Sequence, residues 1–263
     1  MTAEEAAAMR AAAAAPTHLE AISTKEAAYV VEFPESVKVS TPHPGTPEFA
    51  DECKKLDHRP LGYRAIKCAF DIIFSLCMII VGLIPCLFLS IAIAIDTKGT
   101  PVYSQVRAGK YGKSFRIYKF RTMVADSDDV EKYLSPQQLE TWRRERKVED
   151  DPRITPLGRR LRAMSIDEFP QFVNVLLGQI SVIGPRAITF DELEHFGPDK
   201  ELLLSVAPGI TGLWQIGDRN AATFDNGTRQ AIELDYVRRA SLRTDLAIIF
   251  GTFGAMFTRR TGK

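Results

Sequence analysis

The sequence predicts an α/β fold that is rich in helices, has short strands and forms a small membrane-associated domain. Two observations predict it. A run of 24 uncharged residues extends from Ile72 to Ile95, and a segment that alternates like a strand hairpin follows it, among amphipathic helical stretches. The chain has 263 residues, of which 45% are hydrophobic and 25% charged, enough for a core of ordinary size.

Residues 1–58 are expected to form a mobile acidic arm. They are rich in alanine and proline and show no sustained periodicity. They hold ten acidic and five basic side chains, which leaves a net charge of +6 on residues 59–263. That larger part should therefore favour anionic partners such as phosphates or lipid head groups.

The uncharged run is long enough to cross a bilayer, since 24 helical residues extend for about 36 Å. Pro85 interrupts its middle, and Gly82 lies nearby. A proline removes a backbone donor and clashes with the preceding turn. We therefore expect the helix to break at Pro85 into halves of about 20 Å and 15 Å, each too short to span the membrane.

The flanking charges favour a re-entrant membrane helix over residues 59–97. Basic residues lie on both sides of the apolar run: Arg59, Arg64 and Lys67 before it, and Lys98, Arg107, Lys110 and Lys113 after it. The positive-inside rule then places both ends on the cytoplasmic side. A straight transmembrane helix that tolerates the proline stays open as the alternative.

Three further elements follow from the pattern of residues. Residues 101–123 alternate around two glycines, which predicts a hairpin with its turn near 109–112. Residues 130–147 are expected to form an amphipathic helix. The apolar stretch 242–257, followed by basic residues, predicts an interfacial helix that lies along an anionic leaflet, although the same stripe could pack on the domain.

Two adjacent carboxylates, Asp167 and Glu168, come just after Ser165, where residues 156–178 divide into two predicted helices. Either Ser165 or Asp167 could serve as the N-cap of the second helix. Acidic residues at a helix start are commonly caps and dipole partners without any chemistry, and this alternative stays open.

Arginines surround the acid pair in the sequence, which favours chemistry over capping. They are Arg153, Arg159, Arg160, Arg162 and, after the pair, Arg186. A carboxylate held ionised by arginines and a helix N-terminus can attack phosphorus.

Other chemistries find little support. Asp126 and Asp128 form an Asp-x-Asp tripeptide of the kind that holds a metal in some glycosyltransferases, but it lies in a polar connection where an acidic loop is the simpler explanation. Only four histidines are present, three of them in residues 1–58, which argues against a histidine-based metal site. No phosphate-binding glycine motif of the Walker or Rossmann type occurs, and no paired cysteine motif.

Five motifs occur in order along the chain: Tyr118-Lys119-Phe120-Arg121-Thr122-Met123, Asp151-Pro152-Arg153-Ile154-Thr155, the segment Ser165 to Gln171, Ile183-Gly184-Pro185-Arg186, and the segment Pro208 to Gln215. With them the chain resembles, from about Arg64 to its C-terminus, the bacterial sugar transferases. These are the monotopic polyprenyl-phosphate phosphoglycosyl transferases. The segment 141–147 is most similar to members that start exopolysaccharides with galactose or glucose phosphate.

The resemblance implies roles for particular residues. Asp167 would be the nucleophile, Glu168 would bind Mg²⁺, and Arg162 would help to hold a phosphate. The substrate and its phosphates would also be bound by a basic set: Lys119, Arg121, Arg153 and Arg186. The chain departs from the usual family pattern at three positions, with Ile84 for a serine, Phe169 for a leucine and Ala187 for a proline.

The implied reaction transfers hexose-1-phosphate from a UDP-hexose to undecaprenyl phosphate, releases UMP and passes through a covalent aspartyl intermediate. Residues 98–263 would be the catalytic domain on the cytoplasmic face of the bacterial inner membrane, next to anionic lipid and with no nucleic-acid partner. The hexose and the oligomeric state stay open. Two alternatives remain: a metal-dependent glycosyltransferase that releases UDP, and a non-enzymatic membrane scaffold whose acid pair only caps a helix.

Overall fold

A computed structural model describes residues 43–145, 148–217, 222–224 and 226–258, and they belong to one compact unit. Its strands are β1 Val102–Ala108, β2 Ser114–Phe120, β3 Ser181–Ile183 and β4 Gly209–Thr211. Its helices are α2 Pro47–Leu56, α3 Leu61–Thr97, α4 Val130–Tyr133, α5 Pro136–Glu145, α6 Pro156–Ala163, α7 Gln171–Leu176, α8 Phe190–Leu193, α9 Lys200–Leu203, α10 Leu213–Ile216, α11 Thr228–Arg239 and α12 Leu242–Thr258. The helix-rich α/β class with short strands is therefore confirmed.

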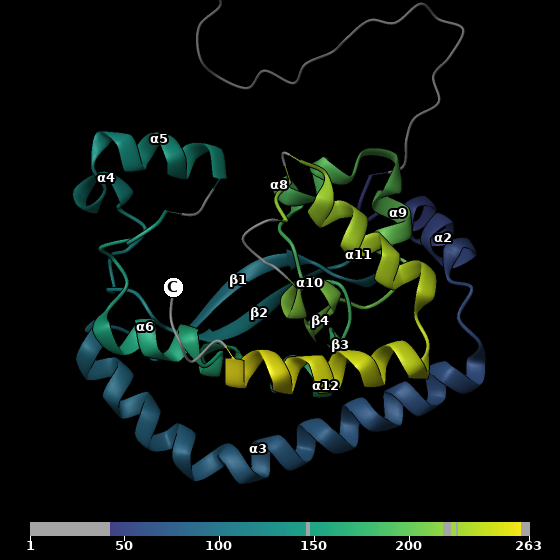
Figure 1. Ribbon diagram of the computed structural model, residues 1–263, viewed down its shortest axis with the longest axis horizontal. Coiled ribbons are helices and arrows are strands. Elements are labelled where there is room, and N and C mark those ends of the chain that lie inside the picture. The colour runs from purple at the N-terminus through teal and green to yellow at the C-terminus, as the bar shows by residue number, and fades with distance from the viewer. Residues whose placement is uncertain (1–42, 146–147, 218–221, 225, 259–263) are drawn as a thin grey trace, which may run out of the picture. The chain divides into compact units, whose positions relative to one another are not determined.

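Two small sheets lie at the centre of the helices (Figure 1). Strands β1 and β2 pair antiparallel, with Ala108 opposite Ser114 beside the turn. The turn itself, Lys110–Gly112, is a 3-10 turn. The predicted hairpin is thus confirmed, with its turn where the two glycines indicated. Strands β3 and β4 form a separate parallel pair.

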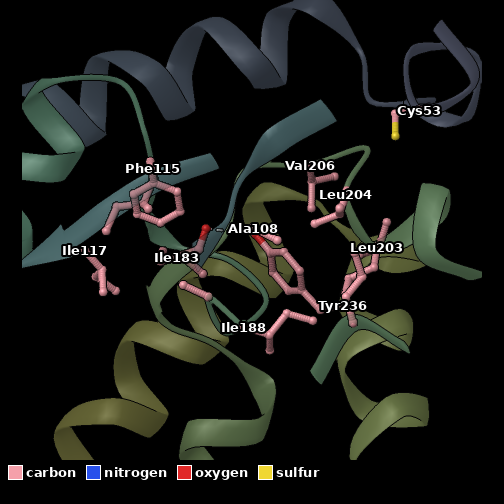
Figure 2. Packing of buried hydrophobic residues seen from close by; sticks show 14 of the residues in the cluster. Cys53, Ala108, Phe115, Ile117, Ile183, Ile188, Leu203, Leu204, Val206 and Tyr236 are labelled. Atoms are coloured by element: carbon pink, nitrogen blue, oxygen red, sulfur yellow. Dashed lines mark hydrogen bonds between the residues drawn. The ribbon is translucent and has the colours of Figure 1, made fainter. Parts of the chain in front are cut away.

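The main core fills the space between the hairpin, β3 and the helices α8, α9 and α11. Figure 2 shows aliphatic side chains packed around the ring of Tyr236, which is 1% exposed. Ile183 and Ile188 are as deeply buried, although they belong to a short strand and to the loop after it. A second, smaller cluster joins Ile93 of α3 to Phe120 and Leu161.

Helix α2 changes the predicted boundary of the acidic arm. Phe49 and Cys53 of this helix are fully buried in the main core, and a Cβ atom on Gly112 of the hairpin turn would lie 2.8 Å from the Phe49 ring. Residues 47–56, which were assigned to the arm, are therefore part of the compact unit. Residues 1–42 of the predicted arm lie outside the described residues.

Helix α3 is a single helix of 37 residues with Pro85 inside it. The prediction of two separate half-helices is therefore wrong, although the ribbon of α3 bends along its course (Figure 1). Both of its ends are attached to the domain. Near its start Asp71 accepts a hydrogen bond from the Val182 amide at 2.9 Å, and at its end the Thr97 carbonyl accepts one from the Ala125 amide at 3.0 Å.

Three other segments were predicted to be helical. The helix predicted over 130–147 is divided into α4 and α5 by Leu134 and Ser135, because the residue before Pro136 disfavours the helical conformation. The separation of residues 156–178 into two helices near Ser165 is confirmed. The apolar closing helix is confirmed as α12, and the basic residues 259–263 lie outside the described part.

The burial of α2 leads to a prediction about stability. Phe49→Ala should lower the free energy of unfolding by about 3–5 kcal/mol, because it opens a cavity in the core. Thermal or denaturant unfolding of the purified protein measures this loss. Lys54→Ala, which truncates an exposed side chain of the same helix, serves as the control. Equal stability of the two variants would show that α2 does not belong to the core.

Candidate active site

The acid pair lies in a 3-10 turn, Ile166–Glu168, between α6 and α7. Ser165 enters this turn in the left-handed conformation, with φ 55°. The Ser165 side chain makes no capping hydrogen bond, and α7 begins after Pro170 without a side-chain cap. Both predicted N-caps are therefore wrong. Neither carboxylate caps α7, although both lie in the first turn of the short 3-10 helix.

Asn174 of α7 holds the acid pair beside the hairpin. Its side chain is fully buried and accepts a hydrogen bond from the Tyr118 amide at 3.0 Å. It also donates to the Arg116 carbonyl at 2.7 Å. Because both partners belong to β2, the next residue of that strand, Lys119, reaches the turn, where its Nζ lies 2.8 Å from Glu168 Oε1.

Arg186 approaches Glu168 from the loop that follows β3. Its guanidinium lies 3.9 Å from Glu168 Oε1. This loop runs against β4 so closely that a Cβ atom on Gly209 would lie 2.1 Å from the Gly184 amide nitrogen. Glycine is therefore required there, and the close approach places Arg186 over the acid pair.

A small open cleft begins at Glu168. The side chains of its polar lining come from the hairpin, from α7, from the loop after β3 and from α10: Arg107, Lys119, Glu168, Gln171, Arg186 and Gln215. Three of these six side chains are cationic and one is anionic. An anionic ligand is therefore attracted to the cleft.

Asp167 is partly buried next to this cleft, and its surroundings raise the pKa of its carboxyl group. Burial is the main cause, and the neighbouring charge of Glu168 adds to it, while Lys119 and Arg162 partly offset both. Lys119 and Arg162 favour the ionised carboxylate, as expected of nearby cations, but burial outweighs them and leaves the pKa above its ordinary value. Asp167 becomes fully ionised only at a higher pH than a surface aspartate, and it is more basic when it does.

Arg162 is held in place for an interaction with Asp167. Its Nε donates to the Thr122 hydroxyl at 2.8 Å. Burial lowers the pKa of its guanidinium, and the attraction of Asp167 and Asp151 opposes that effect. An arginine stays charged in any case, so Arg162 supplies a fixed positive charge to the site.

Two predicted phosphate-binding residues make other contacts. Arg153 is buried, pairs with Asp151 at 2.6 Å and donates to the Ser127 carbonyl at 3.0 Å. Its three nitrogen atoms are thus occupied by protein groups, and the structure contradicts a direct role in binding phosphate. Arg121 donates to the backbone and the hydroxyl group of Thr100 at 2.8 and 3.1 Å, at the end of α3.

The Asp-x-Asp tripeptide lies on the surface, where Asp126 has other partners. Asp126 and Asp128 are both exposed. Asp126 pairs with the ammonium group of Lys132 and accepts a hydrogen bond from the Tyr133 hydroxyl at 2.7 Å. These contacts lower its pKa to about 2. Among the described residues, no group of three or more potential metal-binding side chains occurs.

Sequence reasoning missed a group of charged residues behind Arg186. Glu192 pairs with Arg107 at 2.9 Å and with Arg229 at 3.4 Å. Glu233 is 1% exposed and accepts a hydrogen bond from the Arg186 amide at 3.1 Å. Arg229 and Glu233 are four residues apart on α11, a spacing that normally indicates a solvated ion pair on a helix surface. That spacing gave no sign of their burial.

Comparison with known proteins shows the family of the chain. The family model described as bacterial sugar transferase matches residues 62–259. An undecaprenyl-phosphate galactose phosphotransferase of Salmonella typhimurium is 39% identical over 199 residues, which cover 74% of this chain and 41% of that protein. A UDP-galactose-lipid carrier transferase of Erwinia amylovora is 38% identical, with 74% of this chain and 41% of that protein covered.

A shorter relative matches over nearly its whole length. The exopolysaccharide production protein ExoY of Sinorhizobium fredii is 37% identical over 206 residues, which cover 77% of this chain and 89% of that protein. The chain thus spans less than half the length of the Salmonella and Erwinia proteins but most of ExoY. The match to the family model includes the acid pair, the hairpin and the loop after β3. The chain belongs to the bacterial sugar transferase family.

Proposed function

We propose that the protein transfers hexose-1-phosphate from a UDP-hexose to undecaprenyl phosphate and thereby starts an exopolysaccharide or another glycoconjugate. One observation carries the proposal. A partly buried aspartate, Asp167, lies beside Glu168, which lines a cleft together with the cations Lys119 and Arg186, while the charge of Arg162 attracts Asp167. The names of the Salmonella and Erwinia relatives, which include a lipid carrier and galactose, support the same reaction class.

In the first step, a carboxylate oxygen of Asp167 attacks the β-phosphorus of the UDP-hexose. The bond from that phosphorus to the oxygen that bridges the two phosphates breaks, and UMP leaves with the bridging oxygen. In the second step, a phosphate oxygen of undecaprenyl phosphate attacks the same phosphorus and releases Asp167. Each step exchanges one phosphorus–oxygen bond for another, so no redox partner is required, and the kinetics should be ping-pong.

The cations around the acid pair stabilise the charge that builds up on the phosphoryl oxygens. Lys119 and Arg186 both approach Glu168 Oε1, at 2.8 and 3.9 Å. Arg162 is fixed by Thr122 on the Asp167 side. Donors that are held in place before the substrate arrives need no reorganisation during the reaction, which makes them effective in catalysis.

The donor set fits Mg²⁺ that is shared with a substrate. This ion is commonly bound by one or two carboxylates together with substrate phosphates, and Glu168 and Asp167 supply the carboxylates. Lys119 pairs with Glu168, so it would have to move aside for the ion. Bound Mg²⁺ would neutralise diphosphate charge and assist the departure of UMP. Within the described residues a metal cage made of protein groups alone does not occur.

The apolar surfaces of α3 and α12 support binding of the domain to one leaflet of the bacterial inner membrane. Ile84 and Phe88 of α3 are 67% and 68% exposed, and Phe250 and Phe253 of α12 are 72% and 55% exposed. Exposed apolar surface of this extent marks a lipid or protein interface. Because both ends of α3 are attached to the same domain, a re-entrant course with the domain on the cytoplasmic face fits better than a single span.

A first prediction concerns the nucleophile. Asp167→Asn should lower turnover by at least about a thousand-fold and abolish any covalent sugar-phosphate adduct, because an amide cannot attack phosphorus. The measurement uses membranes, undecaprenyl phosphate and radiolabelled UDP-galactose or UDP-glucose, and follows lipid-bound label, adduct and released nucleotide. Release of UDP in place of UMP, or substantial activity of the variant, would overturn the covalent mechanism.

A second prediction separates Glu168 from Asp167. Glu168→Gln should lower the rate by about ten- to a hundred-fold, because the amide holds Mg²⁺ and pairs with Lys119 more weakly. Raising the Mg²⁺ concentration should restore part of the rate, and the Asp167 adduct should still form. Glu194→Gln, at an exposed carboxylate, is the control. Near-normal rates of Glu168→Gln at every Mg²⁺ concentration would exclude metal binding by this residue.

A third prediction concerns topology. Single cysteines introduced as Gly62→Cys and Thr100→Cys in a cysteine-free variant should both react with an impermeant maleimide in inside-out vesicles, and neither in right-side-out vesicles. Ile84→Cys, which lies in the exposed apolar middle of α3, should stay unlabelled in both. Labelling of positions 62 and 100 from opposite sides would support a transmembrane span.

A further inference from the structure

Glu233 lies directly behind the reaction centre and has no part in the mechanism above. It belongs to α11, is 1% exposed and accepts a hydrogen bond from the Arg186 amide at 3.1 Å. One turn further on, the hydroxyl oxygen of Tyr236 lies 3.3 Å from the Ile183 carbonyl oxygen. Helix α11 therefore contacts both ends of the short loop from Ile183 to Arg186.

The side chain of Arg186 lies between an aromatic ring and the acid pair. Its guanidinium lies 5.3 Å from the centre of the Trp214 ring, and that of Arg229 lies 4.6 Å from the same ring. The other end of the Arg186 guanidinium faces Glu168. The backbone of Arg186 thus rests on Glu233, while its side chain lies between Trp214 and Glu168.

The burial of Glu233 destabilises the folded protein. Its Oε1 has no hydrogen-bond partner in the described part of the chain. Burial raises its pKa from the ordinary 4.5 to about 7, against the opposing effects of the Arg186 amide and of Arg229 and Arg186, while Glu192 adds to the rise. When the pKa of a carboxyl group is higher in the folded than in the unfolded protein, the free energy of unfolding falls as the pH rises from the unfolded to the folded pKa. A costly buried group of this kind is typical of function.

We propose that Glu233 is a positioning residue, which fixes the Arg186 backbone by its hydrogen bond and so holds the Arg186 guanidinium against the phosphoryl group at the acid pair. This inference rests on the proposed function. The proposed role predicts that kcat depends more on the length of the side chain that carries the acceptor oxygen than on its charge. Glutamine keeps an acceptor oxygen at the same distance from α11, whereas aspartate keeps the charge but is shorter by one methylene group.

The test compares Glu233→Asp with Glu233→Gln in the UMP-release assay. We expect the Asp variant to lose about ten-fold in kcat with KM for the UDP-hexose within about two-fold, because Arg186 acts mainly in the transition state. The Gln variant should stay within about three-fold of the wild-type kcat. When Arg186 is already replaced by lysine, adding Glu233→Asp should lower kcat by less than about a further two-fold. The effects of two residues that act together are not additive.

Asp235→Asn is the matched control, because it removes a half-exposed carboxylate from the same helix and should leave kcat unchanged. A wild-type kcat for Glu233→Asp, an equal loss for Glu233→Gln, or additive losses with Arg186→Lys would each overturn the positioning role. Wild-type protein that releases no UMP would instead overturn the proposed function, and the role of Glu233 with it.

Discussion

The hydrogen bonds of the buried Asn174 side chain join the hairpin to the segment that carries the acid pair. Asn174 accepts from the Tyr118 amide and donates to the Arg116 carbonyl and to Gln179. Within the described part of the chain, strand β2 pairs only with β1. Asn174 bonds two backbone groups on the other edge of β2 and thereby fixes α7, and the acid pair before it, next to Lys119.

The acid pair is also tied to the apolar helix α3. Phe169, the residue after Glu168, packs on Gly82 of α3 so closely that a Cβ atom on that glycine would lie 2.1 Å from the ring. The same ring makes an edge contact with Phe172 of α7. Phe169 therefore fills a space that only glycine leaves open, which gives a physical reason for the small residue in the middle of an otherwise bulky apolar helix.

Local patterns predicted much of the fold. Alternation around two glycines predicted the hairpin, and apolar content predicted α3 and α12. One failure depends on contacts between distant residues: the burial of Phe49 makes α2 part of the core, although its neighbours in the sequence are polar. The other lies in α3, which stays helical through Pro85 despite the local cost of a proline, although the neighbouring Ile84 and Phe88 are exposed.

The site shows the same division. Asp167, Glu168, Lys119, Arg162 and Arg186 were predicted and are brought together. Arg153 pairs with Asp151, only two residues before it, and the resemblance that implies a phosphate for Arg153 does not show this local pair. Glu233 was missed for the opposite reason, since a charged residue on an amphipathic helix is normally solvated. Which charges are buried is decided by tertiary packing.

The buried network around Asp245 has a consequence for the proposed reaction with a membrane lipid. This carboxylate of α12 accepts hydrogen bonds from Tyr63 and Lys67 of α3 and from Tyr236 of α11, each at 2.9 Å. Two apolar helices and the catalytic fold are thereby locked as one body. On the proposed membrane seat, the acid pair stays at a constant height above the acyl chains, so the acceptor phosphate reaches it by lateral diffusion in two dimensions.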